Sequence, residues 1–214
     1  YGLSPYSDVL KVLGTTPDVV SLKIAGWSFY NNVDSRIFPF ADYSVNGTIC
    51  SEITRQSGID AYTSLESVWG GYNFDPANNT TLLAMQNGEF YSWQITAIGN
   101  ANIKLTKVNQ FYIYNSASGP TWLTIAYNTT NTWDNFNNYN TIYNDFISNN
   151  SGTSTNYANA INNAIAAKNI IIPAGQTIYF RAIFFSAIDS SGLIGWTNLN
   201  NSSSEDIAFY GIPV

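Results

Sequence analysis

The sequence predicts a mainly β protein, an antiparallel β-sandwich with one or two short helices. Three observations lead to this prediction. Short segments rich in Ile, Val, Tyr, Phe and Thr recur along the chain, and these residues suit a pleated, half-buried surface. Residues that favour turns, chiefly Asn, Gly and Pro, separate the segments. With 214 residues, of which 45% are hydrophobic, the chain is long enough to bury one sizeable core.

The first predicted strand covers residues 19–30, where Val20, Leu22 and Ile24 alternate with polar residues and indicate one buried face. The clearest turn is the dipeptide at Asn87 and Gly88, because both residues tolerate a positive φ. The other predicted strands are 43–53, 89–98, 101–108, 110–114, 122–127, 177–188 and 207–212.

Two segments have helical rather than strand spacing. In 155–168, Tyr157, Ile161 and Ile165 share one stripe, and Thr155 is the expected N-cap. In 133–147, aromatic residues recur every three or four positions, which predicts a second helix, although the intervening Asn residues disfavour it. The Asn-rich stretch 128–155 also fits an elaborated loop.

The composition excludes several classes of partner. Charged residues make up only 10% of the chain, against roughly a quarter in an average protein, and the formal net charge is -6. The eight basic residues are scattered, so the chain has no basic patch for nucleic acid or for an anionic membrane surface. No stretch approaches the ~20 apolar residues of a membrane span.

The residues that usually carry catalysis or bind metals are sparse. The chain has no His, and its carboxylates are mostly isolated in loop-like segments; Glu52 and Glu66 are the best candidates for an enzyme. Cys50 is the only cysteine, and without a base to activate it we expect a buried structural thiol. Segment 73–79 has the residue types of a Ca²⁺ loop without the required spacing. We therefore predict no enzyme, no cofactor and no metal.

Exposed aromatic residues offer an alternative function, because sugars stack on them. Trp69 and Trp196 both lie beside glycines and are predicted to be the most exposed tryptophans. The alternative function is a secreted carbohydrate-binding module or glycosidase.

The pattern Asn-x-Ser/Thr marks seven candidate sites of N-glycosylation, a modification of exported proteins. With 28 Asn and 41 Ser plus Thr among 214 residues, chance alone gives about five such sites. Their positions in predicted turns and loops therefore carry the prediction, rather than their number. The acceptors are Asn46, Asn78, Asn79, Asn128, Asn149, Asn200 and Asn201.

The amino-terminal segment 1–13 is partly apolar and is followed by a hinge at 14–17 that contains Gly14 and Pro17. Three structures fit it: a first strand of the same domain, a short helix capped by Ser4, or a strand donated to a neighbouring subunit. In the last case residues 1–16 form a tail and hinge, and 17–214 form the head domain. The apolar positions of the donor strand are Tyr1, Leu3, Val9, Leu10, Val12 and Leu13.

The tail, its hinge, the charge-poor Asn/Ser/Thr/Tyr composition and the scattered glycosylation patterns together resemble the thread-filament subunits of acid-loving archaea. These are glycosylated proteins whose immunoglobulin-like, pilin-like β-sandwich heads are joined by donor-strand complementation, similar in architecture to bacterial type I pilins. The resemblance spans the layout of the whole chain and rests on no specific motif. The chain lacks the disulfide of type I pilins and the long apolar helix of type IV pilins.

The resemblance implies assembly through the tail and N-linked glycans on the acceptor asparagines. We therefore expect a structural subunit of an extracellular, cell-surface filament that polymerises head to tail with copies of itself and aids adhesion or biofilm formation. The start at Tyr1 rather than Met fits a chain from which a secretion signal has been removed. The first alternative is a virion coat or turret protein.

Overall fold

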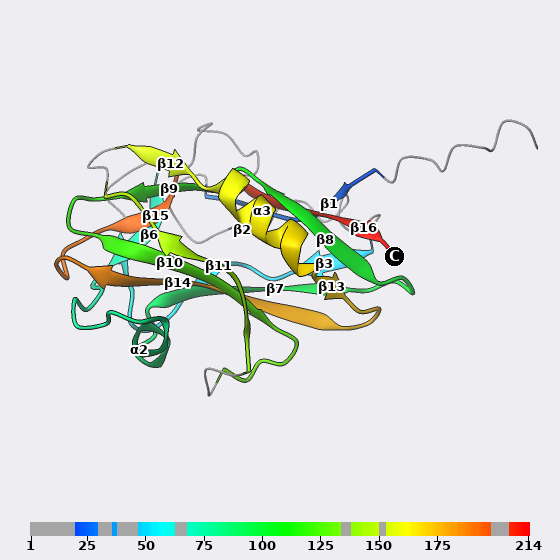
Figure 1. The fold of residues 1–214 in the computed structure, drawn as a ribbon, viewed down its shortest axis with the longest axis horizontal. Coiled ribbons are helices and arrows are strands. Elements are labelled where there is room, and N and C mark those ends of the chain that lie inside the picture. Colours follow the sequence, from blue (N-terminus) through cyan, green and yellow to red (C-terminus); the bar gives the residue numbers. More distant parts are fainter. Residues whose placement is uncertain are drawn as a thin grey trace, which may run out of the picture.

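The computed structural model describes residues 20–29, 36–37, 47–62, 68–133, 138–149, 153–197 and 206–214, with the backbone alone at 36–37. Within these residues antiparallel strands form three sheets in a sandwich-like arrangement (Figure 1). The predicted fold class, a mainly β antiparallel sandwich with few short helices, is confirmed.

The strands are grouped as follows. Sheet B has the order β11 (Asn140–Phe146), β10 (Pro120–Asn128), β14 (Thr177–Ala187), β7 (Phe90–Ala97) and β3 (Thr48–Cys50), with β4 (Thr54–Arg55) also paired to β7. Sheet A has the order β13 (Ile171–Ile172), β8 (Ile103–Asn109), β16 (Ile207–Pro213), β1 (Leu22–Ser28) and β2 (Arg36–Ile37). Sheet C has the order β12 (Ser154–Asn156), β9 (Tyr112–Asn115), β15 (Ile194–Thr197), β6 (Val68–Tyr72) and β5 (Asp60–Tyr62).

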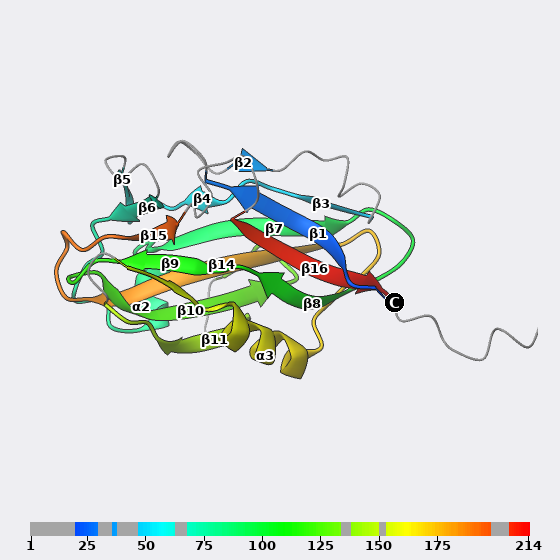
Figure 2. The ribbon, with the colours of Figure 1, turned by 90° about the horizontal axis from the view of Figure 1, so that it is seen from above.

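Sheet B forms one layer of the sandwich, and sheets A and C share the other. Trp27 of sheet A contacts Trp93 of sheet B, with ring centroids 6.1 Å apart, while Trp69 of sheet C contacts Tyr91 of sheet B at 5.4 Å. Figure 2 shows sheets A and C lying end to end across sheet B. The chain passes directly from β8 to β9 through Gln110, whose φ of 58° breaks the extended backbone between the two sheets.

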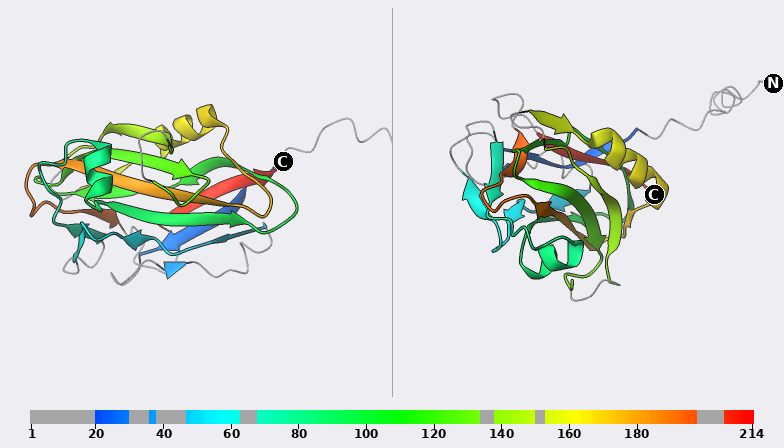
Figure 3. Two further views of the ribbon diagram at one scale, coloured as in Figure 1. Left: turned by 90° about the horizontal axis from the view of Figure 1, so that it is seen from below. Right: turned by 60° about the vertical axis from the view of Figure 1, so that its left-hand side comes forward.

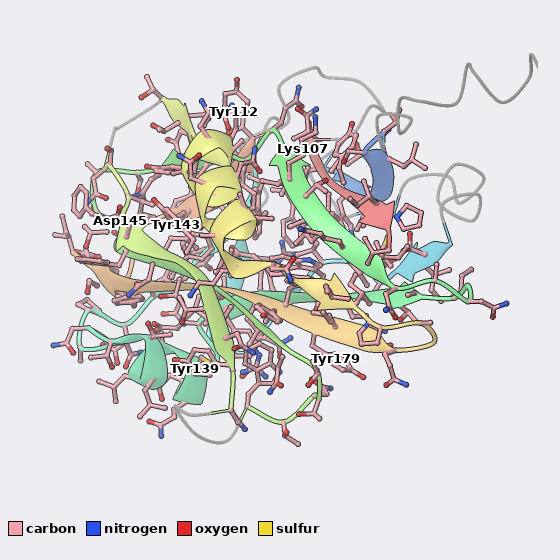
Figure 4. The ribbon with its side chains drawn as sticks, turned by 45° about the vertical axis from the view of Figure 1, so that its right-hand side comes forward. Lys107, Tyr112, Tyr139, Tyr143, Asp145 and Tyr179 are labelled. Carbon is pink, nitrogen blue, oxygen red and sulfur yellow. The ribbon has the colours of Figure 1, made fainter. Side chains whose placement is uncertain are left out.

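Helix α3 (Ala158–Lys168) closes one side of the sandwich between β8 and β11. Its buried face comprises Ala158, Ile161 and Ile165. Asn162 pairs with the edge of β8 as another strand would: its Oδ1 accepts the Val108 N–H at 2.7 Å, and its Nδ2 donates to the Val108 carbonyl at 3.0 Å. Figure 4 shows α3 between β8, which carries Lys107, and β11. The helix therefore protects the edge of β8 from further pairing.

The outer face of sheet B carries a second, smaller apolar cluster, partly covered by helix α2 (Thr81–Gln86) (Figure 3). The helix begins at Thr80, whose hydroxyl accepts the Leu83 N–H at 3.3 Å, and is followed by Gly88 at φ 74°. The predicted turn at Asn87 and Gly88 therefore lies at the end of α2, a helix that was not expected from the sequence, and β7 follows.

Most of the predicted strands are confirmed, and three details are wrong. Residues 140–146 form β11 rather than part of a helix, because they pair with β10 along nearly the whole strand. Thr155 lies in β12 and does not cap α3; the Asn156 side chain accepts the Ala158 N–H instead. Val20 and Leu22 are exposed, so the buried face of β1 begins only at Ile24.

We expect Asn162→Ala to lower the free energy of unfolding by about 1–3 kcal/mol, because it removes both partners of the Val108 backbone. Urea titration followed by circular dichroism measures the change. Asn163→Ala is the matched control, since Asn163 is an exposed residue of the same helix and the substitution gives the same gain in helix propensity. Equal stabilities of the two variants would contradict the role of Asn162.

Candidate functional site

The predicted donor strand lies outside the described residues. This applies to all six of its apolar positions, Tyr1, Leu3, Val9, Leu10, Val12 and Leu13, and to the hinge at 14–17. The described chain begins at Val20, which enters β1 at the end of the molecule where β16 finishes. Assembly through the tail stays a prediction, and the described surfaces that bear on it are the sheet edges.

The edge of sheet B at β11 differs from the protected edge of β8. Six of its seven residues pair with β10, since a register shift leaves out Ile142, and no other described strand adds to it. The Ile147 N–H donates to the Thr121 carbonyl, so these two residues form a hydrogen-bonded pair of the antiparallel ladder. Hydrogen-bonded and non-hydrogen-bonded pairs alternate along such a ladder, so the N–H groups of Asn144 and Phe146 point outward, away from β10. The Asp145 carboxylate accepts the Phe146 N–H at 2.7 Å.

An apolar pair marks the end of this edge. Phe146 is 54% exposed and Trp122, its partner on β10, is 37% exposed. Neither Lys nor Pro, the residues that commonly guard a free edge, occurs in β11. The strand is therefore one edge of sheet B among the described residues. A helix or a loop was expected there, because the aromatic residues of 133–147 recur at helical spacing and the stretch is rich in Asn.

The seven predicted glycosylation acceptors differ in environment. Asn46, Asn200 and Asn201 lie outside the described residues. Asn79 is exposed, and Asn149 is partly exposed. Asn128 is buried and donates through its side-chain amide to the Thr132 carbonyl at 2.6 Å. Asn79 therefore has the most accessible side chain among the described acceptors, and glycosylation of all seven stays a prediction.

Asn78 is buried because it belongs to a hydrogen-bonded group around Glu89. Its Nδ2 donates to Glu89 Oε1 at 2.8 Å, and its Oδ1 accepts from the Asn87 amide at 2.7 Å. The Asp75 N–H donates to the same Glu89 oxygen at 2.6 Å. Glu89 is only 2% exposed, and burial raises the pKa of its carboxyl above the usual value of 4.5.

The candidate catalytic carboxylates do not come together in the described residues. Glu52 is exposed, and Glu66 lies outside the described part of the chain. Asp206 is 2% exposed, and its Oδ2 accepts the Phe29 N–H at 2.8 Å. No group of three or more His, Cys, Asp or Glu side chains able to hold a metal ion is found among the residues that the structure describes.

Cys50 is buried, as predicted. Burial raises the pKa of its thiol to about 11, and the Gly26 backbone of β1 forms a hydrogen bond with it. In the same strand, the Thr48 hydroxyl donates to the Ile24 carbonyl at 2.6 Å. These two contacts join β3 of sheet B to β1 of sheet A, so the thiol has a structural position at a closed side of the sandwich.

The predicted exposure of Trp69 and Trp196 is wrong, since they are 2% and 1% exposed. The adjacent glycines allow two strands to lie close together. Gly70 on β6 pairs with Gly195 on β15, and a Cβ atom on Gly195 would lie 2.6 Å from the Gly70 Cα. Both tryptophans instead face the core.

We expect the contribution of Glu89 to the stability of the protein to fall as the pH rises above about 4.5. A carboxyl whose pKa is raised in the folded state binds its proton more tightly there than in the unfolded chain. The stabilisation that Glu89 contributes is therefore complete below the pKa that its carboxyl has in the unfolded chain. It is lost as the pH rises through the pKa of the carboxyl in the folded protein, by at most about 1.4 kcal/mol per pH unit.

Urea unfolding between about pH 4 and about pH 7 measures this effect, with Glu89→Gln expected to give a flatter profile than the wild type. Glu52→Gln is the control for loss of an exposed carboxylate. Parallel profiles for the wild type and Glu89→Gln would show that Glu89 does not contribute.

Neither described helix has the length and apolar character that crossing a membrane requires. No protein-family model matches the chain, and no curated protein is significantly similar to it in sequence.

Proposed function

We propose that the protein is the structural subunit of an extracellular filament, in which residues 1–13 of one copy add as a strand to the head of the next. The observation that carries this proposal is the edge at β11, which has seven residues and lacks guarding Lys or Pro. Long free edges promote pairing between chains, and soluble proteins usually protect them. This chain uses Asn162 to protect the edge of β8. At β11, helix α3 packs against the strand and the Asp145 carboxylate accepts the outward Phe146 N–H, so a donated strand would pair through the outward N–H of Asn144.

The end of the head from which the tail leaves supports a head-to-tail arrangement. Val20 is 69% exposed, Leu22 39% and Val214 55%. The antiparallel register of β1 and β16, which pairs Leu22 with Gly211, brings these three side chains to the same end. Exposed apolar groups that gather in one place indicate a contact surface. A contact repeated in one direction without closing on itself gives an open filament.

The proposed biological role is adhesion or biofilm formation, with N-linked glycans on the exposed acceptors. The rival proposal, a virion coat or turret protein, uses the same kind of sandwich but predicts closed particles. Electron microscopy of material assembled from the purified chain distinguishes long filaments from closed shells.

Deletion of residues 1–13 is expected to abolish polymerisation, because the donated strand is lost while the head remains. Sedimentation and electron microscopy of the full and shortened chains measure the polymer. A synthetic peptide of residues 1–13 is expected to bind the shortened chain, and circular dichroism checks that the head is folded. Normal polymerisation of the shortened chain would overturn the proposal.

The acceptor edge has its own test in Asn144→Pro, which removes an outward N–H without removing a bond to β10. We expect the concentration needed for assembly to rise at least about tenfold, which corresponds to about 1.4 kcal/mol. Asn144→Ala is the matched control: it loses the bond that Asn144 Oδ1 accepts from the Thr124 hydroxyl but keeps the outward N–H. Equal assembly of the two variants would show that the tail does not pair with β11.

A further inference from the structure

The outer face of sheet B contains a polar hollow of about 480 Å³, within the usual range for small-molecule sites of roughly 300–1,000 Å³. Its floor is formed by β7 and β14, one wall by the segment 51–56, and the other by the end of the loop that reaches Trp133. Four segments far apart in the sequence therefore meet around one concave surface.

An arginine held between two aromatic rings lines the hollow. The Arg181 guanidinium carbon is 3.9 Å from the ring centroid of Phe90 and 4.2 Å from that of Trp133. Each contact is a cation–π interaction, and together they restrict the orientation of the guanidinium. Arg181 is partly exposed and lines the hollow, so a guanidinium of restricted orientation contributes to its surface.

The wall and floor beside Arg181 consist of hydroxyl and amide groups. Ser92 lies opposite Arg181 in the register of β7 and β14, and its Oγ accepts from Gln56 Nε2 at 3.0 Å. Ser92 Oγ also lies 3.0 Å from Thr54 Oγ1. Two residues further along, on the same face, Gln94 lies opposite Tyr179. The hollow therefore places donors, acceptors and the flat ring of a partly exposed tyrosine on one surface.

The charged side chains that line the hollow have no net charge. Glu52 contributes one negative charge and Arg181 one positive charge, while the chain as a whole carries a formal charge of -6. The field of the whole protein therefore does not favour an anionic ligand. A neutral ligand that is rich in hydroxyl groups matches the available donors and acceptors, and its apolar C–H face matches the tyrosine ring.

A second hollow of about 320 Å³ continues from the first. The two share Phe90, Asn131, Trp133 and Arg181, and the second extends to Leu82 and Met85 of α2. Together they form a groove over the face of sheet B.

We propose that this groove binds a neutral oligosaccharide. Tyr179 stacks on one sugar ring, and Arg181, Gln94, Gln56 and Glu52 form hydrogen bonds with its hydroxyl groups. The site is independent of filament assembly, because the groove lies on the face of sheet B and the proposed pairing occurs at the edge β11. Figure 4 shows Tyr179 on β14, away from Tyr143 and Asp145 of β11.

Calorimetric titration of the full-length protein with neutral tetrasaccharides of glucose, mannose and N-acetylglucosamine tests the proposal, with a sulfated disaccharide as the anionic comparison. We expect at least one neutral probe to bind more tightly than the anionic one. Hydrogen exchange with the bound probe is expected to slow in peptides that cover 51–56, 90–94 and 177–183.

Three variants locate the binding site. Tyr179→Ala and Gln94→Ala are each expected to weaken binding at least about tenfold, which corresponds to about 1.4 kcal/mol. Tyr179→Phe keeps the ring and is expected to bind within about threefold of the wild type. Tyr112→Ala, in sheet C of the other layer, is the matched control and is expected to bind like the wild type.

Circular dichroism establishes that each variant is folded, and Gln94→Ala keeps the test decisive if Tyr179→Ala destabilises the head. Three results would each overturn the proposal: no neutral probe binds at millimolar concentration, the anionic probe binds best, or both folded alanine variants retain wild-type affinity.

Discussion

The architecture depends on aromatic packing between the two layers, because sheets A and C are held in one layer by their common contact with sheet B. In sheet B, Trp93 stacks on Phe180 with centroids 5.5 Å apart and planes at 5°, beneath Trp27 and Phe209 of sheet A. In sheet C, Trp196 lies 4.7 Å from Tyr91 of sheet B. Ring pairs of this kind contribute about 0.5–1.5 kcal/mol each beyond the burial of their surface.

The boundary between sheets A and C is filled by two further rings. Phe29 directly follows β1 and stacks on Trp196 at 5.7 Å, and Phe111 directly precedes β9 and meets the same tryptophan edge-on at 6.0 Å. A chain with one cysteine and 10% charged residues has no intrachain disulfide, and few ion pairs are available to it. Its stability therefore rests chiefly on this packing.

The sequence was sufficient for the long strands and insufficient for features formed by distant partners. Strands such as β7 and β14 were predicted because eight or more residues rich in Ile, Tyr, Phe and Thr are a clear signal, whereas β2, β4 and β13 have two residues each and are too short to show one. The burial of Asn78 depends on Glu89, eleven positions away. The polar hollow combines four separate segments, so no local pattern could reveal it.

The two proposals use different parts of sheet B. Pairing at β11 occupies an edge, while the groove around Arg181 lies on the outer face, over β7 and β14. A polymer of such subunits repeats the groove along its length. Weak binding by each copy then becomes strong for a surface that carries many sugar chains, because several copies engage at once.

The reactivity of Cys50 can be used to measure how often β3 separates from β1. The thiol belongs to β3 and faces β1. Its hydrogen bond with the Gly26 backbone and the hydrogen bond from the Thr48 hydroxyl to the Ile24 carbonyl connect sheet B to sheet A. Because the thiol is buried, we expect a maleimide or iodoacetamide to reach it when β3 separates from β1. The rate of alkylation at this one sulfur therefore reports how often the sandwich opens along that side.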